Sequence, residues 1–312
     1  MDLPADKGPI LVLGGTGHYG RHIVAALVQR GVPVWVLSRS ADRARALLGD
    51  VEVVEGDIRD RAVIARVLAG VRALIVSVSA FAPATIRQVG EIERDAVLTT
   101  LVEAERAGLR RVVYLSVYEA RPEVAAEVKL ESGAIKAAVE AALAGSGLNW
   151  TILGIPPSMQ LFFALLRGDT MIVPGGGPPA LPTISPVDVG AIAAQSALRD
   201  DLGGQRFRLA GPEALSFPEA ARRIGQATGR SIRFRKVPLV LPRIAAALLW
   251  LPALLSDRLL FARQMLGFIQ LLNRFPAVDA AADFRRLQET FDYVPTTLEM
   301  EVARHREAAR GR

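Results

Sequence analysis

The stretch Ile10-Leu-Val-Leu-Gly-Gly-Thr-Gly-His-Tyr-Gly20 decides the fold of this chain. Its first four residues form an apolar run that predicts a buried strand, and residues 21–28 continue with helical periodicity. Glycines stand between them at positions 14, 15, 17 and 20. Backbone without Cβ atoms can approach a phosphate closely, and the N–H groups at the start of a helix attract negative charge. The stretch therefore predicts a binding site for a dinucleotide pyrophosphate, although a turn that binds nothing would have the same spacing.

The turn supplies seven of the expected cofactor contacts. They are Gly14, Gly15, Thr16, Gly17, His18, Tyr19 and Gly20. After the second expected strand, where folds that prefer NAD carry an acid, this chain has Arg39, Ser40 and Arg43 instead. An arginine suits a 2′-phosphate, so NADP(H) is the expected cofactor, with NAD(H) as the other option. Arginine is common in this chain, so a solvated surface arginine is the alternative interpretation.

Two further strand ends carry candidate cofactor contacts. After the third strand, we expect Asp57 to accept from the adenine amino group, with Ile58 beside it and Asp60 capping the next helix. After the fourth strand, Ser77 and Ser79 lie beside the expected path of the cofactor. They could also be merely small residues that leave the cofactor room.

Short apolar strands alternate with helices through the first half of the chain, which predicts an α/β fold. A parallel sheet covered on both faces, joined by right-handed crossovers, gives the doubly wound Rossmann class. The expected strands are 10–13, 33–37, 51–54, 73–78, 111–115 and 149–153, and the expected later helices are 41–48, 60–69, 86–107 and 131–144. We expect a dinucleotide-binding domain over residues 1–155, with 183–200 packing back on it.

The regular alternation ends after residue 155. Residues 156–312 are expected to form a smaller, mostly helical lobe for a substrate or partner. Its expected elements are helices over 158–167 and 187–198, a strand over 206–209, a helix from Ser216 to Thr228, two apolar helical stretches and a charged helix from Thr296. Asp188 is expected to be a structural residue that caps its helix rather than a catalytic one.

Composition excludes several classes of function. The chain has no cysteine and only three scattered histidines, so thiol chemistry is excluded and no metal site is expected. The net charge of +6 comes mostly from dispersed arginines without a recognition helix or aromatic platform, so nucleic acid is not an expected partner. Residues 1–7 lack a signal-peptide pattern, and the uncharged stretch 244–256 is shorter than the ~20 residues of a membrane span. The expected location is cytoplasmic, with membrane association left open.

Several motifs together resemble the atypical short-chain dehydrogenase/reductases, in particular the NmrA-like group. They are the glycine turn, Arg39, Gly56-Asp-Ile-Arg-Asp60, and segments 107–116, 136–140, 145–153, 184–189 and 209–213. The apolar tail with Thr296-Thr-Leu298 is similar to the branch containing the dehydrogenase-like accessory subunit of respiratory complex I. The resemblance implies a Rossmann fold that binds NAD(P), and it is much less specific for any activity.

The resemblance also implies a Tyr-x-x-x-Lys pair, in which the lysine lowers the pKa of the tyrosine and holds the nicotinamide ribose. Lys136 matches the lysine, but Ser132 stands in place of the tyrosine. Ser116 matches the family's strand-end serine, and Tyr118 nearby is a candidate for a displaced acid. Alternatively, Lys136 forms only a surface ion pair with Glu140, and Tyr118 only packs beside the cofactor.

Two features shape the expected pocket and its surroundings. The family's arginine after the sixth strand is replaced by Gly154, which predicts a more apolar pocket. Residues 239–272 could form a core or dimer face, a wall of a substrate pocket, or a surface that rests on a membrane. Arg243, Arg258 and Arg263 at the edges of this segment would suit anionic headgroups.

Three functions remain open. The first is an oxidoreductase that moves hydride between NADP(H) and an apolar carbonyl, enone or quinone, with Lys136 orienting the ribose and an unidentified acid or solvent supplying the proton. The second is a non-catalytic, cofactor-dependent sensor or assembly protein, which the absent tyrosine supports. The third is a membrane-associated scaffold, a hypothesis that only the apolar tail supports. The expected partners are a small apolar substrate and a membrane or protein at 239–272, with the chain a monomer or homodimer.

Overall fold

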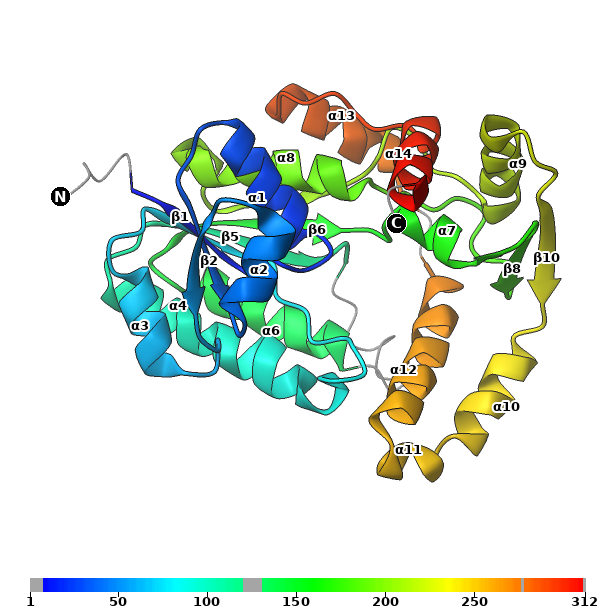
Figure 1. The fold of residues 1–312 in the computed structure, drawn as a ribbon, viewed down its shortest axis with the longest axis horizontal. Helices are drawn as coiled ribbons and strands as arrows, with labels where there is room; N and C mark the ends of the chain where they lie inside the picture. Colours follow the sequence, from blue (N-terminus) through cyan, green and yellow to red (C-terminus); the bar gives the residue numbers. More distant parts are fainter. Residues whose placement is uncertain (1–7, 120–130, 276–277, 311–312) are drawn as a thin grey trace.

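The structure, a computed structural model, describes residues 8–119, 131–275 and 278–310. The amino-terminal residues 1–7, where no signal peptide is expected, lie outside this part. Parallel strands form one sheet in the order β3-β2-β1-β4-β5-β6-β9 (Figure 1). They are β1 (Ile10–Leu13), β2 (Val34–Ser38), β3 (Glu52–Glu55), β4 (Ala73–Val76), β5 (Arg111–Val117), β6 (Asn149–Ile155) and β9 (Gln205–Arg208). The strand order reverses between β1 and β4, so the predicted doubly wound fold is confirmed.

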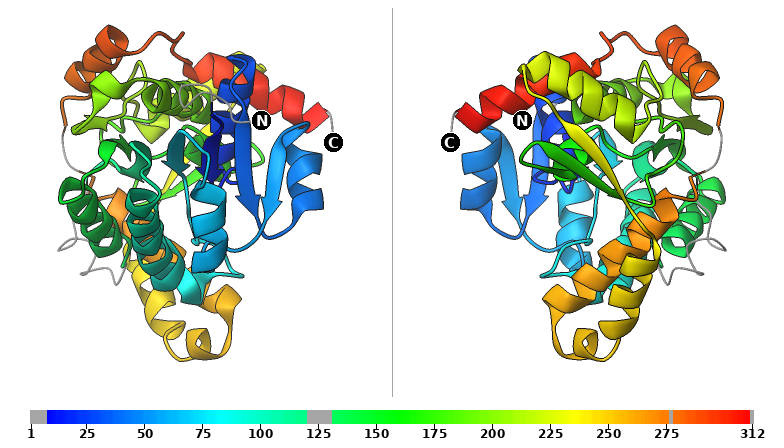
Figure 2. Two further views of the ribbon diagram at one scale, coloured as in Figure 1. Left: turned by 90° about the vertical axis from the view of Figure 1, so that its left-hand side faces the viewer. Right: turned by 90° about the vertical axis from the view of Figure 1, so that its right-hand side faces the viewer.

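Helices cover both faces of the sheet (Figures 1 and 2). One face carries α1 (Gly20–Gln29), α2 (Ala41–Leu48) and α8 (Pro186–Leu198); the other carries α3 (Arg61–Leu68), α4 (Ala96–Arg106) and α6 (Ser132–Ala144). Side chains of β1 alternate between two cores: Ile10 and Val12 pack into the first, and Leu11 and Leu13 into the second. Burial on both faces is the reason that β1 is an uninterrupted apolar run.

The expected long helix over residues 86–107 is wrong in its first half. A 3₁₀ turn (Ile86–Gln88) and a π-helical segment (Glu91–Asp95) precede α4, and the chain leaves the helix at Gly108 with φ +70°. The π segment carries the buried Glu93, whose carboxylate accepts from the Ala80 N–H at 2.7 Å. Irregular turns of this kind often occur at functional sites.

A third core belongs to the carboxy-terminal half. Its sheet has the order β10-β8-β7, with β7 (Leu166–Arg167), β8 (Thr170–Pro174) and β10 (Arg233–Val237). The expected helix over 158–167 is only α7 (Gln160–Ala164), because the chain turns at Gly168, φ +57°, into the β7–β8 hairpin. Residues of α7, α9 (Phe217–Thr228) and α14 (Leu298–Arg310) pack on this sheet. The predicted Ser216 cap of α9 is confirmed, since its side chain accepts from the Glu219 N–H.

The chain does not divide at residue 155 into two separate units. Strand β9 lies within the range expected for the smaller lobe, yet it pairs with β6 as the edge strand of the main sheet. Helix α8 packs on α1. An unexpected helix, α13 (Ala280–Thr290), also returns to the main sheet, and the next residue, Phe291, contacts the Phe207 ring of β9. The first core is therefore built from both halves of the sequence.

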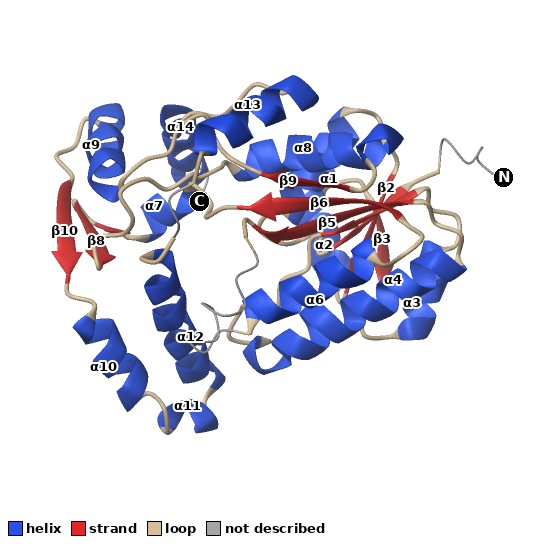
Figure 3. Ribbon diagram, turned by 180° about the vertical axis from the view of Figure 1, so that it is seen from behind, coloured by secondary structure: helices blue, strands red, loops and turns tan. Residues whose placement is uncertain are grey.

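Three consecutive helices extend away from the sheet (Figures 1 and 3). They are α10 (Val240–Leu248), α11 (Pro252–Leu255) and α12 (Asp257–Leu272). The Arg87 guanidinium donates to the Asp257 carboxylate at 2.6 Å and to the carbonyls of Ala253 and Leu254, each at 3.0 Å. These contacts fasten α11 and α12 to the loop after β4. In the described residues, no helix is long and apolar enough to cross a membrane.

Asp188 is structural, but it does not cap α8. Ser185 is the cap, accepting from the Val187 N–H, while Asp188 lies within the first turn and is 1% exposed. Its carboxylate accepts from the backbone N–H and the hydroxyl of Thr296, at 2.9 and 2.6 Å, and so holds the chain before α14 against α8. Burial raises the pKa of Asp188 to about 6, and the Thr296 hydrogen bonds offset only part of the effect.

We expect Asp188 to make the free energy of unfolding depend on pH. The pKa of its carboxyl rises from an ordinary 3.8 to about 6 on folding, so its stabilising contribution is present at low pH and is lost as the pH rises through 6. Urea denaturation gives the free energy of unfolding of the wild type and of Asp188→Asn. The wild-type value minus the variant value should fall by about 2–3 kcal/mol as the pH rises from 3.8 to 6. A difference that stays constant or grows with pH would contradict this assignment.

Candidate functional site

The glycine turn lies at the carboxyl end of β1, where the strand order reverses. A Cβ on Gly14 would collide with the Ser77 carbonyl at the end of β4, and one on Gly20 would collide with the Gly14 carbonyl. These two glycines bring strand and helix together. Thr16, Gly17 and His18 are instead exposed, so the turn presents its backbone outward at the start of α1. An open backbone cradle at a helix start fits a pyrophosphate.

The expected ribose site lies where β2 ends. Arg39 and Arg43 are exposed, and among the described residues neither forms an ion pair, while Ser40 occupies the N-cap position before α2. The sequence analysis found no acid after β2, but the adjacent strand supplies one: Glu55 pairs with Ser38 in the sheet register. Its carboxylate accepts from the Ala41 N–H at 3.1 Å, at the start of α2. The acid is therefore engaged by the helix, and both arginines remain available for an anion.

The expected adenine site contains an internal ion pair. Asp57 accepts from the backbone and side chain of Arg59, with 2.8 Å between the carboxylate and Nη2, and these hydrogen bonds lower the pKa of Asp57. The adenine roles of Asp57 and its neighbour Ile58 stay predictions. The cap role of Asp60 is confirmed, because its side chain accepts from two N–H groups of α3.

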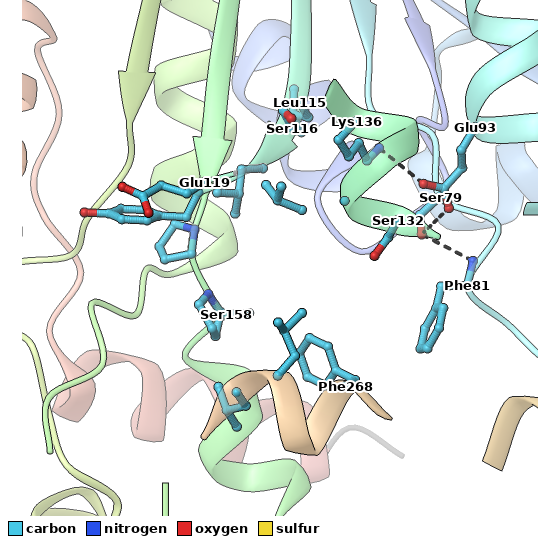
Figure 4. A pocket seen from close by; sticks show the side chains of 18 of the residues that line it. Ser79, Phe81, Glu93, Leu115, Ser116, Glu119, Ser132, Lys136, Ser158 and Phe268 are labelled. Atoms are coloured by element: carbon cyan, nitrogen blue, oxygen red, sulfur yellow. Dashed lines mark hydrogen bonds and ion pairs between the residues drawn. The ribbon is translucent and has the colours of Figure 1, made fainter. Parts of the chain in front are cut away.

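A cavity of about 490 Å³ opens beside the ends of β4, β5 and β6 (Figure 4). One side carries the residues named from the sequence: Tyr19, Ser77, Ser79, Ser116, Tyr118, Ser132 and Lys136. The opposite wall comes from α12, through Met265, Phe268, Leu271 and Leu272. Residues that are far apart in the sequence therefore enclose one space, polar at the sheet edge and apolar at α12.

Lys136 does not form the surface ion pair with Glu140 that was one expectation for it. The lysine is buried in α6, and its Nζ lies 3.2 Å from the carboxylate of Glu93 and 5.2 Å from the ring centre of Tyr114. Burial alone would lower the pKa of Lys136, but the Tyr114 oxygen and the Glu93 carboxylate outweigh it, and the pKa is raised. A charged ammonium therefore stands at the polar end of the cavity.

Glu93 and Tyr114 are residues that the sequence analysis missed. Glu93 also accepts from the Ser79 hydroxyl at 3.4 Å, so it joins the loop after β4 to α6 (Figure 4). The Tyr114 hydroxyl is buried and has no hydrogen-bond partner among the described residues. No local pattern distinguished either residue, since each meets Lys136 only through the packing of separate elements.

The two candidate catalytic hydroxyls, those of Ser116 and Tyr118, are hydrogen-bonded to carboxylates. Ser116 donates to Glu140 at 2.5 Å, and Arg206 binds the same carboxylate at 3.0 Å. The Tyr118 hydroxyl donates to Asp283 of α13, an acid that the sequence analysis also missed. Burial first, and then Asp283, raise the pKa of Tyr118, which makes this phenol a weaker acid. Ser132 contributes the remaining hydroxyl beside Lys136.

Gly154 leaves space for a guanidinium from the neighbouring strand. A Cβ at this position would lie 2.9 Å from Nη1 of Arg206, which comes from β9. Arg206 donates to the carbonyls of Val117 and Tyr118, at 2.9 and 3.0 Å. An arginine thus lies beside the position where this chain lacks the family's arginine, but it braces the end of β5 and does not line the cavity.

Comparisons with known proteins agree with this geometry. Residues 14–199 match the family described as NAD(P)H-binding. The chain is 28% identical to NAD(P)H azoreductase of Xenophilus azovorans, covering 80% of this chain and 84% of that protein. It is 32% identical to the uncharacterized oxidoreductase YesF of Bacillus subtilis, covering 72% and 73%. Its fold is similar to that of the NADPH complex of the quinone oxidoreductase QOR2 from Escherichia coli, with TM-score 0.71, 22% identity, and 95% and 99% coverage.

The buried pair of Lys136 and Glu93 gives a prediction about stability. We expect Lys136→Met to lower the free energy of unfolding by about 3–5 kcal/mol, because it leaves the Glu93 carboxylate buried without its partner. The double variant Lys136→Met/Glu93→Gln should recover most of this loss. Urea denaturation measures both.

A neighbouring exposed pair provides the control for this experiment. Arg94 lies next to Glu93 in the sequence and pairs with Asp95 at 2.7 Å, with both side chains about half exposed. Arg94→Met should leave the stability unchanged within error. Equal losses in the single and double Lys136 variants would contradict a coupled buried pair.

Proposed function

The chain belongs to the NAD(P)H-binding family of NmrA-like, atypical short-chain dehydrogenase/reductases, and on that basis we propose an NADP(H)-dependent oxidoreductase acting on an apolar carbonyl, enone or quinone. The observation that carries this proposal is the cavity between the sheet edge and α12, which joins a buried ammonium to an apolar wall. The names of the azoreductase and quinone oxidoreductase relatives support a redox role.

The cofactor assignment rests on the turn and on the end of β2. The residues proposed to hold the pyrophosphate are those of the glycine turn, through backbone N–H groups at the start of α1. Arg39 and Arg43 would bind the 2′-phosphate, because both are exposed at the carboxyl edge of the sheet and neither pairs with a carboxylate in the described residues. Glu55 lies close by but is bonded to the Ala41 N–H, which limits its access to a ribose hydroxyl.

The chemistry is proposed to occur at the polar end of the cavity. Bound there, the nicotinamide supplies or accepts a hydride. Lys136 would orient the ribose by donating to its hydroxyls, and its raised pKa keeps it charged at neutral pH. The α12 wall would exclude water and hold an apolar substrate. Since the hydroxyls of Ser116 and Tyr118 are bonded to carboxylates, solvent or the Lys136–Glu93 pair would supply the proton that accompanies the hydride.

One observation favours a second candidate, a cofactor-dependent sensor or assembly protein. Position 132 carries no phenol, and the nearby phenol of Tyr118 has a raised pKa and a carboxylate partner. A chain of this kind would bind NADP(H) without turnover. The activity experiment below separates the two candidates.

The preference for NADP(H) is tested at Arg39. We expect Arg39→Ala to weaken NADPH binding about 10- to 100-fold, because a charge-assisted contact to the 2′-phosphate is lost, and to change NADH binding less than about twofold. Fluorescence titration with each nucleotide measures both constants. The control is Arg45→Ala on α2, whose guanidinium lies 3.5 Å from Asp42 and should not affect either nucleotide. Equal weakening of both nucleotides would contradict recognition of the phosphate.

The substrate cavity is tested by filling it. We expect the protein to oxidise NADPH with members of a panel of quinones and enones. Met265→Trp should lower kcat/KM for the best substrate about tenfold or more, because the larger side chain narrows the cavity beside α12. NADPH affinity should not change. Leu259→Trp on the same helix, 36% exposed and outside the cavity, should retain activity. Tight NADPH binding with no oxidation of the cofactor by any member of the panel would favour the sensor.

A further inference from the structure

An exposed apolar surface runs along α10 and over α11 to the start of α12. We call it the apolar tip; its residues are Val240, Leu241, Ile244, Leu248, Trp250, Leu251, Leu254, Leu255 and Leu259. Leu255 is 90% exposed, Leu248 73%, Leu251 61% and Trp250 57%. On α10 the exposed residues 241, 244 and 248 recur at helical spacing, so they form one stripe that continues into the turn and α11. Scattered apolar residues on a surface are ordinary, but a contiguous group of this kind marks a binding surface.

The tip is held in place by the rest of the molecule. Arg87 bonds to the carbonyls of Ala253 and Leu254, and the Phe81 and Phe261 rings lie 5.3 Å apart between the loop after β4 and α12. Ala253 is 1% exposed while its neighbours Leu254 and Leu255 face outward. The fold therefore presents the leucines to solvent although it buries the adjacent backbone.

The charged residues of the segment around the tip are mostly basic. Residues 231–275 contain one acidic side chain, Asp257, and its carboxylate is bonded to Arg87. The basic residues of this segment are Arg233, Arg235, Lys236, Arg243, Arg258, Arg263 and Arg274. Arg243 lies on α10 and Arg258 at the start of α12, both exposed, and neither pairs with a carboxylate in the described residues. An apolar tip with a basic border complements an anionic, apolar layer.

We propose that the apolar tip docks on an anionic phospholipid bilayer, with α10 and α11 lying in the interface and Trp250 at headgroup depth. The chemistry matches an interfacial segment: a strong apolar stripe, flanking arginines and a tryptophan. The tip rests on the membrane and does not cross it, since no described helix is long enough to span it. The cavity lies behind the same α12 helix, so docking would place its apolar wall near the lipid.

A second copy of this chain fits the tip less well. A two-fold contact through the tip would bring Arg243 and Arg258 of both copies together, and no acidic residue of the tip could neutralise them. The basic border would oppose such a contact, whereas anionic headgroups would neutralise it. Charge therefore favours the bilayer as the occupant.

The test is partition of the purified full chain into vesicles of stated composition. We expect co-sedimentation with phosphatidylcholine vesicles that contain phosphatidylglycerol, much weaker binding to phosphatidylcholine alone, and loss of binding as salt is raised. Trp35→Phe/Trp150→Phe leaves Trp250 as the sole tryptophan. Its emission should shift to the blue on the anionic vesicles and be quenched by brominated lipid.

Two pairs of variants separate the tip from the rest of the surface. Leu251→Glu/Leu255→Glu should reduce partition at least about tenfold, and Arg243→Glu about fivefold or more. The matched controls are Val294→Glu, which is 81% exposed in the segment between α13 and α14, and Arg45→Glu on α2. Figure 1 shows α13 and α14 at the opposite end of the molecule from α11. Both control variants should bind as the wild type does. NADPH titration of every variant checks that the chain is folded.

Three results would overturn the proposal. The first is no binding to anionic vesicles at low salt by chain that still binds NADPH. The second is equal loss of binding in the tip variants and their controls. The third is a dimer in sedimentation velocity that Leu251→Glu/Leu255→Glu dissociates while vesicles bind none of the proteins, which would assign the tip to a second copy. Because none of these readouts measures turnover, the proposal can fail or succeed independently of the oxidoreductase activity.

Discussion

The close contact of three backbone segments at the end of β1 is the constraint on which the rest of the molecule depends. Gly14, Gly20 and the Ser77 carbonyl meet where any Cβ would intrude, so strand β1, helix α1 and strand β4 can converge only with these glycines. This convergence lies where the strand order reverses, the position at which an open α/β sheet binds its ligand. The same contact that closes the core therefore leaves the backbone around Gly17 exposed, where we propose that it receives a phosphate.

The polar end of the cavity depends on charges that different elements bring together. Glu93 comes from a π-helical segment, Lys136 from α6, and the hydroxyls beside them from strand ends. An isolated charge at this depth would be costly, and each is retained because its partner is equally buried. The ammonium of Lys136 is thus positioned by the pair, and the serine at position 132 does not remove this positive charge.

Helix α12 has two faces with different environments. Met265 and Phe268 line the cavity, while Leu259 near its first turn belongs to the apolar tip. Two contacts hold α12 against the loop after β4: the bond between Arg87 and Asp257, and the packing of the Phe261 ring on Phe81. An apolar substrate and an apolar surface partner would therefore meet the same rigid element, which is a physical reason for the unusual density of leucine in residues 239–272.

The sequence by itself determined the sheet, the glycine turn, the caps at Asp60 and Ser216, and the family, because these depend on neighbours in the chain: apolar runs, residues without Cβ and side chains that accept from the next turn. It could not determine the π segment before α4, the partner of Lys136, the tie between Asp188 and Thr296, or the place of β9 and α13. Those features depend on contacts between segments far apart in the chain, as with Glu93 and Lys136. Only the tertiary structure decided which of the candidate side chains share one cavity and which are already bonded to a carboxylate. Packing between distant segments sets burial and ion pairing, and it produces no periodic pattern in the sequence.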